Sequence, residues 1–213
     1  MITNLECLSQ ESFLSGLMEL ANRDRDFAHI LETFGTPPIW SREPGFPTLL
    51  RIILEQQVSL AAARAVFERL CLLVVPLTPE NFLTFNDLQL KEIGFSRQKT
   101  VYCYALANAI VNGQLDLTQL ETLDETAIRT ELKRIKGIGD WTVDIYLLMA
   151  LQYPDVFPKG DLGLAIALQK IKGLTARPTP DELEAIAESW RPWRAVATRI
   201  LWHYYLESRK SKL

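Results

Sequence analysis

Two glycines separated by one residue, Gly137 and Gly139, join two stretches whose residues favour helix, 125–135 and 140–152. This pattern predicts a helix, a tight turn and a second helix. Glycine has no Cβ and tolerates positive φ, so the turn can be sharp and a bulky partner can approach its backbone closely. The first N–H groups of the second helix lack intrahelical partners and carry the positive end of the helix dipole, which attracts an anion such as a phosphate. An ordinary helix end at a glycine has the same pattern, so the turn alone leaves both interpretations open.

Basic side chains crowd the same corner of the sequence. They are Arg129, Lys133, Arg134 and Lys136, all within eight residues before the turn. Their positive charge favours the anion-binding interpretation over a purely structural turn.

A carboxylate that follows the second helix can lie close to this turn. The second helix has 13 residues and a length of ~20 Å at ~1.5 Å per residue. The linker 153–160 has 8 residues and spans at most ~28 Å. Asp161, which follows the linker, can therefore lie beside the turn. An aspartate before the apolar run LGLAIAL is also a typical helix N-cap, and that alternative stays open.

The motif GIGDWT, followed 20 residues after Trp141 by the aspartate of FPKGD, resembles the signature of the helix-hairpin-helix DNA glycosylases. The chain is most similar to the 3-methyladenine DNA glycosylase II branch, from about Phe46 to Tyr204. The resemblance implies a monofunctional enzyme that excises alkylated bases such as 3-methyladenine from duplex DNA in base excision repair. Its partner would be double-stranded DNA containing damaged bases, and a monomer is expected.

The resemblance assigns roles around the reacting sugar. Asp161 would be the catalytic carboxylate, which stabilises an oxocarbenium-like transition state. Trp141 and Trp202 would line the base pocket, where an indole face attracts a cationic alkylated base by roughly 0.5 to 2 kcal/mol. Bifunctional relatives carry a lysine nucleophile at the position of Trp141, and an indole cannot form the Schiff base. Ile145 stands where a better-known member has an aromatic residue, so the pocket is expected to differ in shape.

The resemblance also assigns contacts with DNA. Gln57 lies at the position that family members insert through the minor groove to fill the space of the flipped base. The hairpin residues Lys136, Gly137, Gly139 and Thr142 would contact the backbone. The segment 94–99 is open to two interpretations, a second DNA contact or a solvated helix start.

No required cofactor is expected. By resemblance, the backbone carbonyls of Lys133, Ile135 and Gly137 would hold a sodium or potassium ion at the hairpin. Cys7, Cys71 and Cys103 lie far apart without a CxxC motif, so neither an iron–sulfur cluster nor a zinc site is predicted.

The helical periodicity throughout predicts an all-α fold. By resemblance the fold has two helical lobes with a DNA-binding cleft between them. Residues 41–153 would form one lobe that ends in the helix-hairpin-helix motif, and residues 1–40 would pack with 154–213 as the other.

Composition limits the alternatives. No apolar run is long enough to cross a membrane and no signal peptide is evident, so a cytoplasmic, nucleoid-associated location is expected, or a nuclear one in a eukaryote. A net charge of −3 argues mildly against tight non-specific DNA binding, but a local basic patch can suffice. The rival hypotheses are a non-enzymatic helix-hairpin-helix DNA-binding module and a helical interaction protein without a nucleic-acid role.

Overall fold

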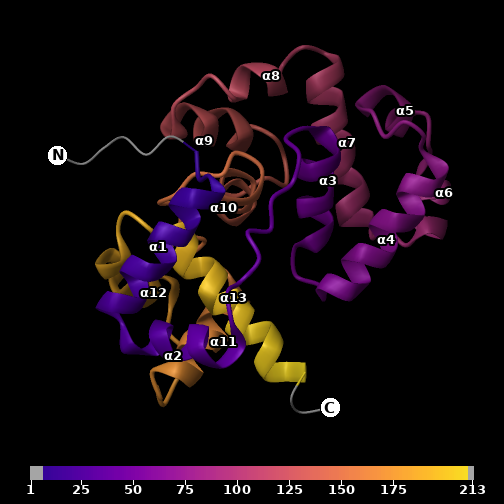
Figure 1. Ribbon diagram of the computed structural model, residues 1–213. Coiled ribbons are helices and arrows are strands. Elements are labelled where there is room, and N and C mark those ends of the chain that lie inside the picture. The colour runs from indigo at the N-terminus through magenta and orange to yellow at the C-terminus, as the bar shows by residue number, and fades with distance from the viewer. Residues whose placement is uncertain (1–6, 211–213) are drawn as a thin grey trace. The chain divides into compact units, whose positions relative to one another are not determined.

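The computed structural model describes residues 7–210, and every regular element in that range is a helix (Figure 1). The predicted all-α class is confirmed. Residues 1–6 and 211–213 of the predicted terminal lobe lie outside the described range. Helix starts follow local capping chemistry, in which a side-chain oxygen accepts a hydrogen bond from a first-turn N–H. The residues that cap helices in this way include Ser9, Asp24, Ser59, Thr78, Ser96 and Thr179.

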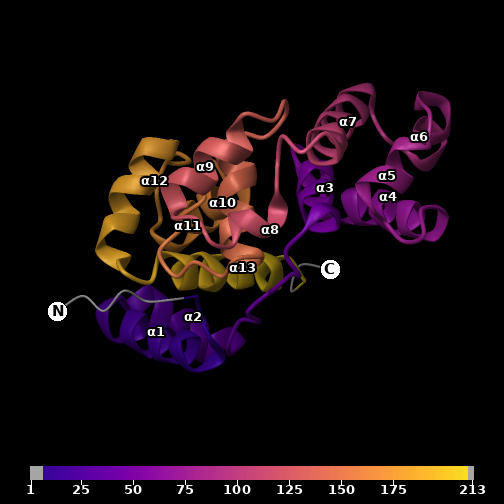
Figure 2. The same ribbon diagram turned by 90° about the horizontal axis from the view of Figure 1, so that it is seen from above.

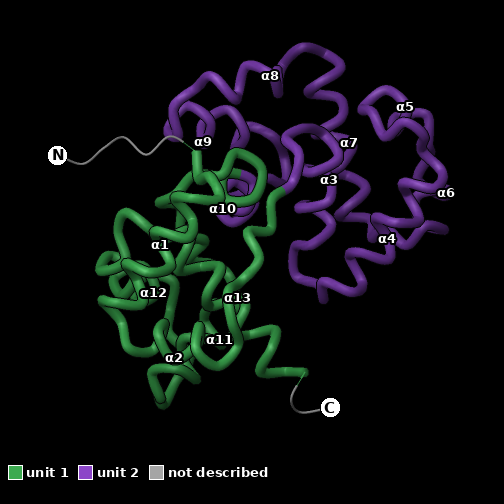
Figure 3. The backbone as a smooth tube through the Cα atoms, in the orientation of Figure 1, with its two compact units in different colours: residues 1–41, 147–213 green, residues 42–146 purple. Residues whose placement is uncertain are grey.

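The chain divides into two compact units, residues 1–41 with 147–213 and residues 42–146 (Figure 3). The second boundary lies inside helix α10 (Asp140–Met149), whereas the sequence-based division places it after Tyr153. The hydrogen bonds of α10 explain the difference. Its Tyr146 hydroxyl accepts a bond from Gly45 N–H of the 42–146 unit at 3.1 Å. The carbonyl of Leu148 accepts one from the buried Arg199 guanidinium of the other unit at 2.8 Å.

The unit formed by both ends of the chain packs around its last helix. Helix α13 (Arg194–Lys210) contacts α1 (Gln10–Arg23), α2 (Arg25–Phe34) and α11 (Leu162–Ile171), and the grouping is visible in Figures 1 and 2. Its core includes Trp190 and Trp193, which are buried. The remaining elements are α12 (Pro180–Ala187) and the 3₁₀ turn η1 (Glu188–Trp190).

The 42–146 unit packs around α3 (Phe46–Glu55), an almost wholly buried helix. It contacts α4 (Leu60–Leu73) and α7 (Arg97–Val111), and α5 (Pro79–Leu83) packs on α7. The other helices are α6 (Asp87–Ile93), α8 (Leu117–Leu120), α9 (Glu125–Lys133) and the start of α10.

The two hairpin helices are shorter than predicted. Helix α9 ends at Lys133, and the chain then tightens into three-residue steps, with hydrogen bonds from Arg134 N–H to Glu131 O and from Ile135 N–H to Leu132 O. Such tighter bonds satisfy the last carbonyls of a helix as it enters a turn. Helix α10 ends at Met149, whose carbonyl accepts a bond from the Gln152 side-chain amide at 2.7 Å.

Candidate nucleic-acid interface and active site

The packing and backbone conformation of the hairpin require a glycine at position 137. Gly137 has φ +92°, in the region that favours glycine. A Cβ at this position would lie 2.1 Å from the Tyr102 ring, so the hairpin rests directly on that aromatic face. Gly137 therefore has a structural role whether or not DNA binds.

The second glycine has no such constraint. A Cβ on Gly139 would meet no protein atom within 4 Å, and its φ lies outside the left-handed region. The residue is exposed and directly precedes α10, whose first-turn N–H groups lack intrahelical partners. The protein's own packing therefore does not require a glycine here, and the exposed backbone of this residue is sterically open.

Most of the basic cluster already has carboxylate partners. Arg129 pairs with Glu125 at 2.8 Å and with the buried Asp144 at 2.7 Å. Burial raises the pKa of Asp144 to about 6, an effect that the nearby Arg129 opposes. Lys133 pairs with Asp140 and Arg134 with Glu131. Within residues 7–210, the exposed Lys136 makes no such pair, so it is the cation of this cluster best placed for a phosphate.

The predicted intercalating residue protrudes from a tight junction. Gln57 is exposed and has φ +58°, two residues after α3 ends and two before Ser59 caps α4. Val58 and Leu60 beside it are also exposed, at 49% and 59%. A polar side chain flanked by exposed apolar ones suits insertion into a stack of bases.

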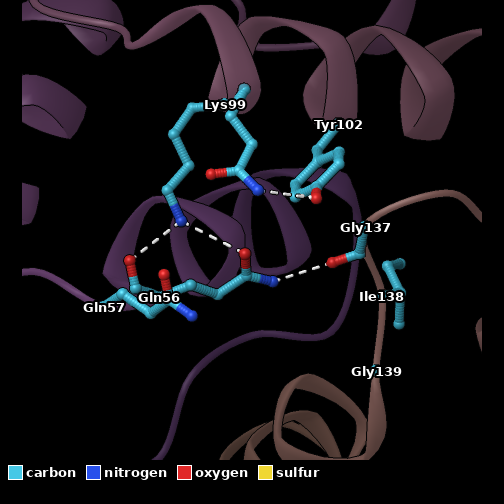
Figure 4. A pocket seen from close by; sticks show the side chains of 8 residues that line it. Gln56, Gln57, Lys99, Tyr102, Gly137, Ile138 and Gly139 are labelled. Atoms are coloured by element: carbon cyan, nitrogen blue, oxygen red, sulfur yellow. Dashed lines mark hydrogen bonds between the residues drawn. The ribbon is translucent and has the colours of Figure 1, made fainter.

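A hydrogen-bond network joins this junction to the hairpin (Figure 4). The side-chain amide of Gln56 donates to Gly137 O at 2.8 Å and to the Thr142 hydroxyl at 2.9 Å. Lys99 donates to the side-chain oxygen of Gln56 at 3.1 Å. An open pocket of about 340 Å³ is lined by Gln56, Lys99 and Gly137 together with Gln57 and Gly139.

Two residues differ from their sequence-based interpretations. Lys99, at the end of the 94–99 segment, is only 9% exposed, so its own side chain is not a surface DNA contact, whereas Ser96, Arg97 and Gln98 of the segment are exposed. Thr142 is 1% exposed, and its hydroxyl faces Gln56, so its side chain supports the hairpin from within rather than reaching DNA. Sequence reasoning missed Gln56, because its partners lie 81 and 86 residues further along the chain.

Asp161 has a partner that the sequence did not reveal. As the alternative interpretation predicted, it caps α11, with Oδ1 accepting from Leu164 N–H at 3.0 Å. The same oxygen also accepts a bond from the indole N–H of Trp202 at 3.2 Å. Trp202 in turn has an edge-to-face contact with Trp40, with ring centroids 6.3 Å apart. The carboxylate is therefore oriented by the indole N–H of Trp202 in addition to the N–H group of the helix that it caps.

The structure places the predicted site residues in both units. Asp161 and Trp202 lie together in the unit formed by the chain ends. Half-buried Trp141, Gln57 and the hairpin belong to the 42–146 unit. Ile145, where the resembling branch has an aromatic, is buried in that unit at 3% exposure.

The predicted cation ligands are compatible with an ion. Ile135 O accepts one hydrogen bond, from Ile138 N–H, and Gly137 O accepts one from Gln56. Each carbonyl oxygen has two lone pairs, so both retain capacity for a monovalent cation, as would Lys133 O. Among residues 7–210, no group of three or more histidine, cysteine or carboxylate side chains could hold a metal.

The turn between α9 and α10 makes this chain a helix-hairpin-helix protein. The profile of the "HhH-GPD superfamily base excision DNA repair protein" matches residues 50–192. The chain belongs to this superfamily, as the motif resemblance predicted.

Several relatives share most of its length. Escherichia coli DNA-3-methyladenine glycosylase 2 is 28% identical, and the alignment covers 93% of this chain and 71% of that protein. The putative DNA-3-methyladenine glycosylase YfjP of Bacillus subtilis is 28% identical over 80% of this chain, which spans 62% of YfjP. The structure of Schizosaccharomyces pombe Mag1, a 3-methyladenine DNA glycosylase in complex with abasic DNA, matches with a TM-score of 0.81 and 26% identity, over 93% of this chain and 97% of Mag1.

Over residues 7–210, no helix has the length and apolar character needed to cross a bilayer.

Proposed function

We propose that this protein is a DNA glycosylase that removes alkylated bases such as 3-methyladenine from double-stranded DNA in base excision repair. The names of its relatives support this activity, and abasic DNA, which Mag1 holds, is the product of base removal. The observation that carries the proposal is the Asp161 carboxylate, whose Oδ1 accepts hydrogen bonds from the N–H groups of Leu164 and Trp202.

The chemistry is the hydrolysis of an N-glycosidic bond. The bond from C1′ to the base nitrogen breaks, and the electron pair leaves with the base. The sugar gains positive charge, which a fixed carboxylate such as that of Asp161 stabilises electrostatically. Water then adds at C1′ and loses a proton, which leaves an abasic site and the free base.

The 42–146 unit would hold and open the duplex. The exposed Gly139 backbone and the start of α10 bind a phosphate, Lys136 adds a charge, and Gln57 fills the gap left by the flipped nucleotide. Trp141 and Trp202 provide aromatic faces for a base that alkylation has made cationic.

The enzyme would act without lyase activity. A lyase forms a Schiff base between a lysine amine and C1′, and the position that carries the lysine in bifunctional relatives is Trp141. Its indole has no nucleophilic amine.

The carbonyls of Lys133, Ile135 and Gly137 would hold a sodium or potassium ion. Such an ion adds a positive charge beside the hairpin N–H groups and so strengthens their attraction for a phosphate. Comparing duplex affinity in potassium, sodium and tetramethylammonium chloride at equal ionic strength tests this site. Equal affinities in the three salts would contradict it.

Product analysis tests the activity. The protein is incubated with methylated duplex DNA, and the released bases are separated by chromatography. Release of 3-methyladenine or another alkylated base supports the proposal. Tight binding to the duplex without release of any base would favour the rival hypothesis of a non-enzymatic DNA-binding module.

A further inference from the structure

Lys99 closes the end of helix α3. Its ammonium donates to three oxygens: the Ile53 carbonyl, the Gln56 carbonyl at 3.0 Å and the Gln56 side-chain oxygen at 3.1 Å. The two carbonyls belong to the last turn of α3, where the negative end of the helix dipole favours a cation. An ammonium has three N–H groups, so all the donors of Lys99 are used. Gln56, which Lys99 holds, directly precedes the exposed Gln57.

Gln56 continues the connection to the hairpin. Its side-chain oxygen faces Lys99, and its NH₂ group donates to Gly137 O and to the Thr142 hydroxyl. The opposite amide orientation would place the NH₂ group against the ammonium, so the network permits one orientation only. One side chain therefore bridges the end of α3 and the turn between α9 and α10.

Helix α7 supports both ends of this bridge. Lys99 lies beneath the α3 terminus, and Tyr102, three residues later on the same helix, lies beneath Gly137. Residues three apart share one face of a helix, so a single rigid surface carries both elements. The Tyr102 hydroxyl is itself held by the Gln98 side-chain amide at 2.8 Å (Figure 4).

We propose that Lys99 and Gln56 are positioning residues that lock the Gln57 loop (residues 56–59) onto the hairpin, so that phosphate binding and base-stack insertion occur in one fixed register. This inference rests on the proposed function, because it assigns a register to the same DNA-binding surface. Neither residue touches the reacting sugar. Their effect is exerted through Gln57 and through the hairpin backbone.

A purely structural role explains the arrangement less well. Burying an ammonium costs free energy, and here burial lowers the pKa of Lys99 to about 8. An apolar side chain of similar length would fill the same space without that cost. What an apolar side chain cannot do is fix the α3 carbonyls and the Gln56 amide in one geometry.

Two matched substitutions separate positioning from packing. Lys99→Met and Gln56→Met keep side-chain length and remove the hydrogen bonds, and Lys99→Arg keeps the charge and donors. The probe is a duplex with one 7-methylguanine and 2-aminopurine as its neighbour, whose fluorescence rises when the bases unstack. Single-turnover base release and affinity for undamaged duplex are measured on the same samples.

We expect both methionine variants to lose most of the fluorescence rise and to release base about 10- to 100-fold more slowly, since small misplacements in an active site cost rates of that order. Affinity for undamaged duplex should change less than about threefold, because Gly139 and Lys136 remain. Lys99→Arg should recover part of both signals. The double variant should be no worse than the poorer single one, because residues that act as one unit are not additive.

Lys91→Met, which removes an exposed lysine of α6, is the control and should behave as wild type. Methionine variants with wild-type fluorescence and release would overturn the inference, as would losses that multiply in the double variant.

If Lys99→Met does not fold, as judged by its melting temperature, the half-buried Gln56→Met decides the matter. If wild type unstacks the probe but releases no base, the proposed activity fails while the fluorescence comparison still tests the coupling. No fluorescence rise with wild type would overturn the coupling directly.

Discussion

The indole N–H of Trp202 donates a hydrogen bond to Oδ1 of Asp161 at 3.2 Å, and the same oxygen accepts the bond that caps α11. The cap would form without the tryptophan. The indole hydrogen bond therefore orients a carboxylate that already caps its helix. This relationship gives Trp202 a role beyond lining a pocket.

Trp202→Phe tests that role, because it keeps an aromatic ring and removes the N–H donor. A lost hydrogen bond to a charged group is worth about 1.5 kcal/mol, so base release should slow roughly tenfold. Single-turnover kinetics and the melting temperature are the measurements.

Trp193→Phe is the matched control for this substitution. Trp193 also donates its indole N–H to a carboxylate, that of Glu19 at 2.6 Å, but in the core of the same unit. It should lower the melting temperature and leave the rate of base release unchanged. Equal rates for Trp202→Phe and wild type would contradict the orienting role of Trp202.

The two hairpin glycines should respond in opposite ways to alanine. Gly137→Ala places a methyl group 2.1 Å from the Tyr102 ring at φ +92°, so we expect a loss of stability of at least about 1 kcal/mol and a melting temperature lower by several degrees. Gly139→Ala meets no protein atom, so its melting temperature should be that of wild type. Its affinity for duplex DNA should fall about tenfold, or about 1.4 kcal/mol, because the methyl group holds the phosphate away.

Duplex affinity at fixed moderate salt and thermal unfolding separate the two effects. Gly139→Ala with unchanged affinity would show that no phosphate approaches the hairpin backbone.

Borohydride reduction tests the absence of lyase activity. With Trp141 at the position of the nucleophile, we expect no covalent protein–DNA adduct, while a known glycosylase/lyase gives one under the same conditions. Lys99 has a lowered pKa, as a Schiff-base lysine would, but the residue is only 9% exposed and its amine is engaged with three oxygens. An abundant adduct would contradict the monofunctional assignment, and its loss in Lys99→Met would identify the lysine.

Base unstacking should weaken as pH rises through about 8, where Lys99 loses its charge. Burial raises the pKa of the neighbouring Cys103 thiol, and Glu55 of α3 forms ion pairs with Arg42 and Arg51. The hairpin groups in the network, Gly137 O and the Thr142 hydroxyl, carry no charge.

Stability should change in the other direction. Because the folded pKa lies below the unfolded value of 10.5, the unfolded chain binds more protons between pH 8 and 10.5, so this lysine's contribution to the free energy of unfolding rises with pH. The measurement is 2-aminopurine fluorescence from pH 7 to 9.5, with Lys99→Arg as control because arginine stays charged. Parallel pH profiles for the two proteins would contradict the assignment.

Local chemistry made much of the fold predictable. Ser9, Asp24 and Thr179 cap helices as their sequence contexts indicate, because a cap depends on residues two or three positions away. The Asp161 cap was foreseen for the same reason.

Contacts between distant parts of the sequence were not predictable in this way. Trp202 lies 41 residues from Asp161, and Lys99 lies 43 from Gln56, so nothing in their neighbourhoods reveals these bonds. One signal for Lys99 was present. It precedes Cys103 by four residues and Leu106 by seven, which places it on the buried face of α7. Gln56 was missed for the same reason, since only the fold shows which of the two glutamines faces the hairpin.

The central claim is that Asp161 acts on the sugar rather than only capping α11, and Asp161→Asn tests it most directly. The asparagine side-chain oxygen can still accept the bonds from Leu164 and Trp202, and asparagine caps helices as well as aspartate, so melting temperature and DNA affinity should stay near wild type. The negative charge is lost, and the second oxygen is replaced by an NH₂ group. Loss of one preorganised electrostatic group costs ~3 to 4 kcal/mol, so single-turnover release of an alkylated base should slow by about 10²- to 10³-fold. Release at nearly the wild-type rate would contradict the catalytic assignment and favour a protein that only binds DNA.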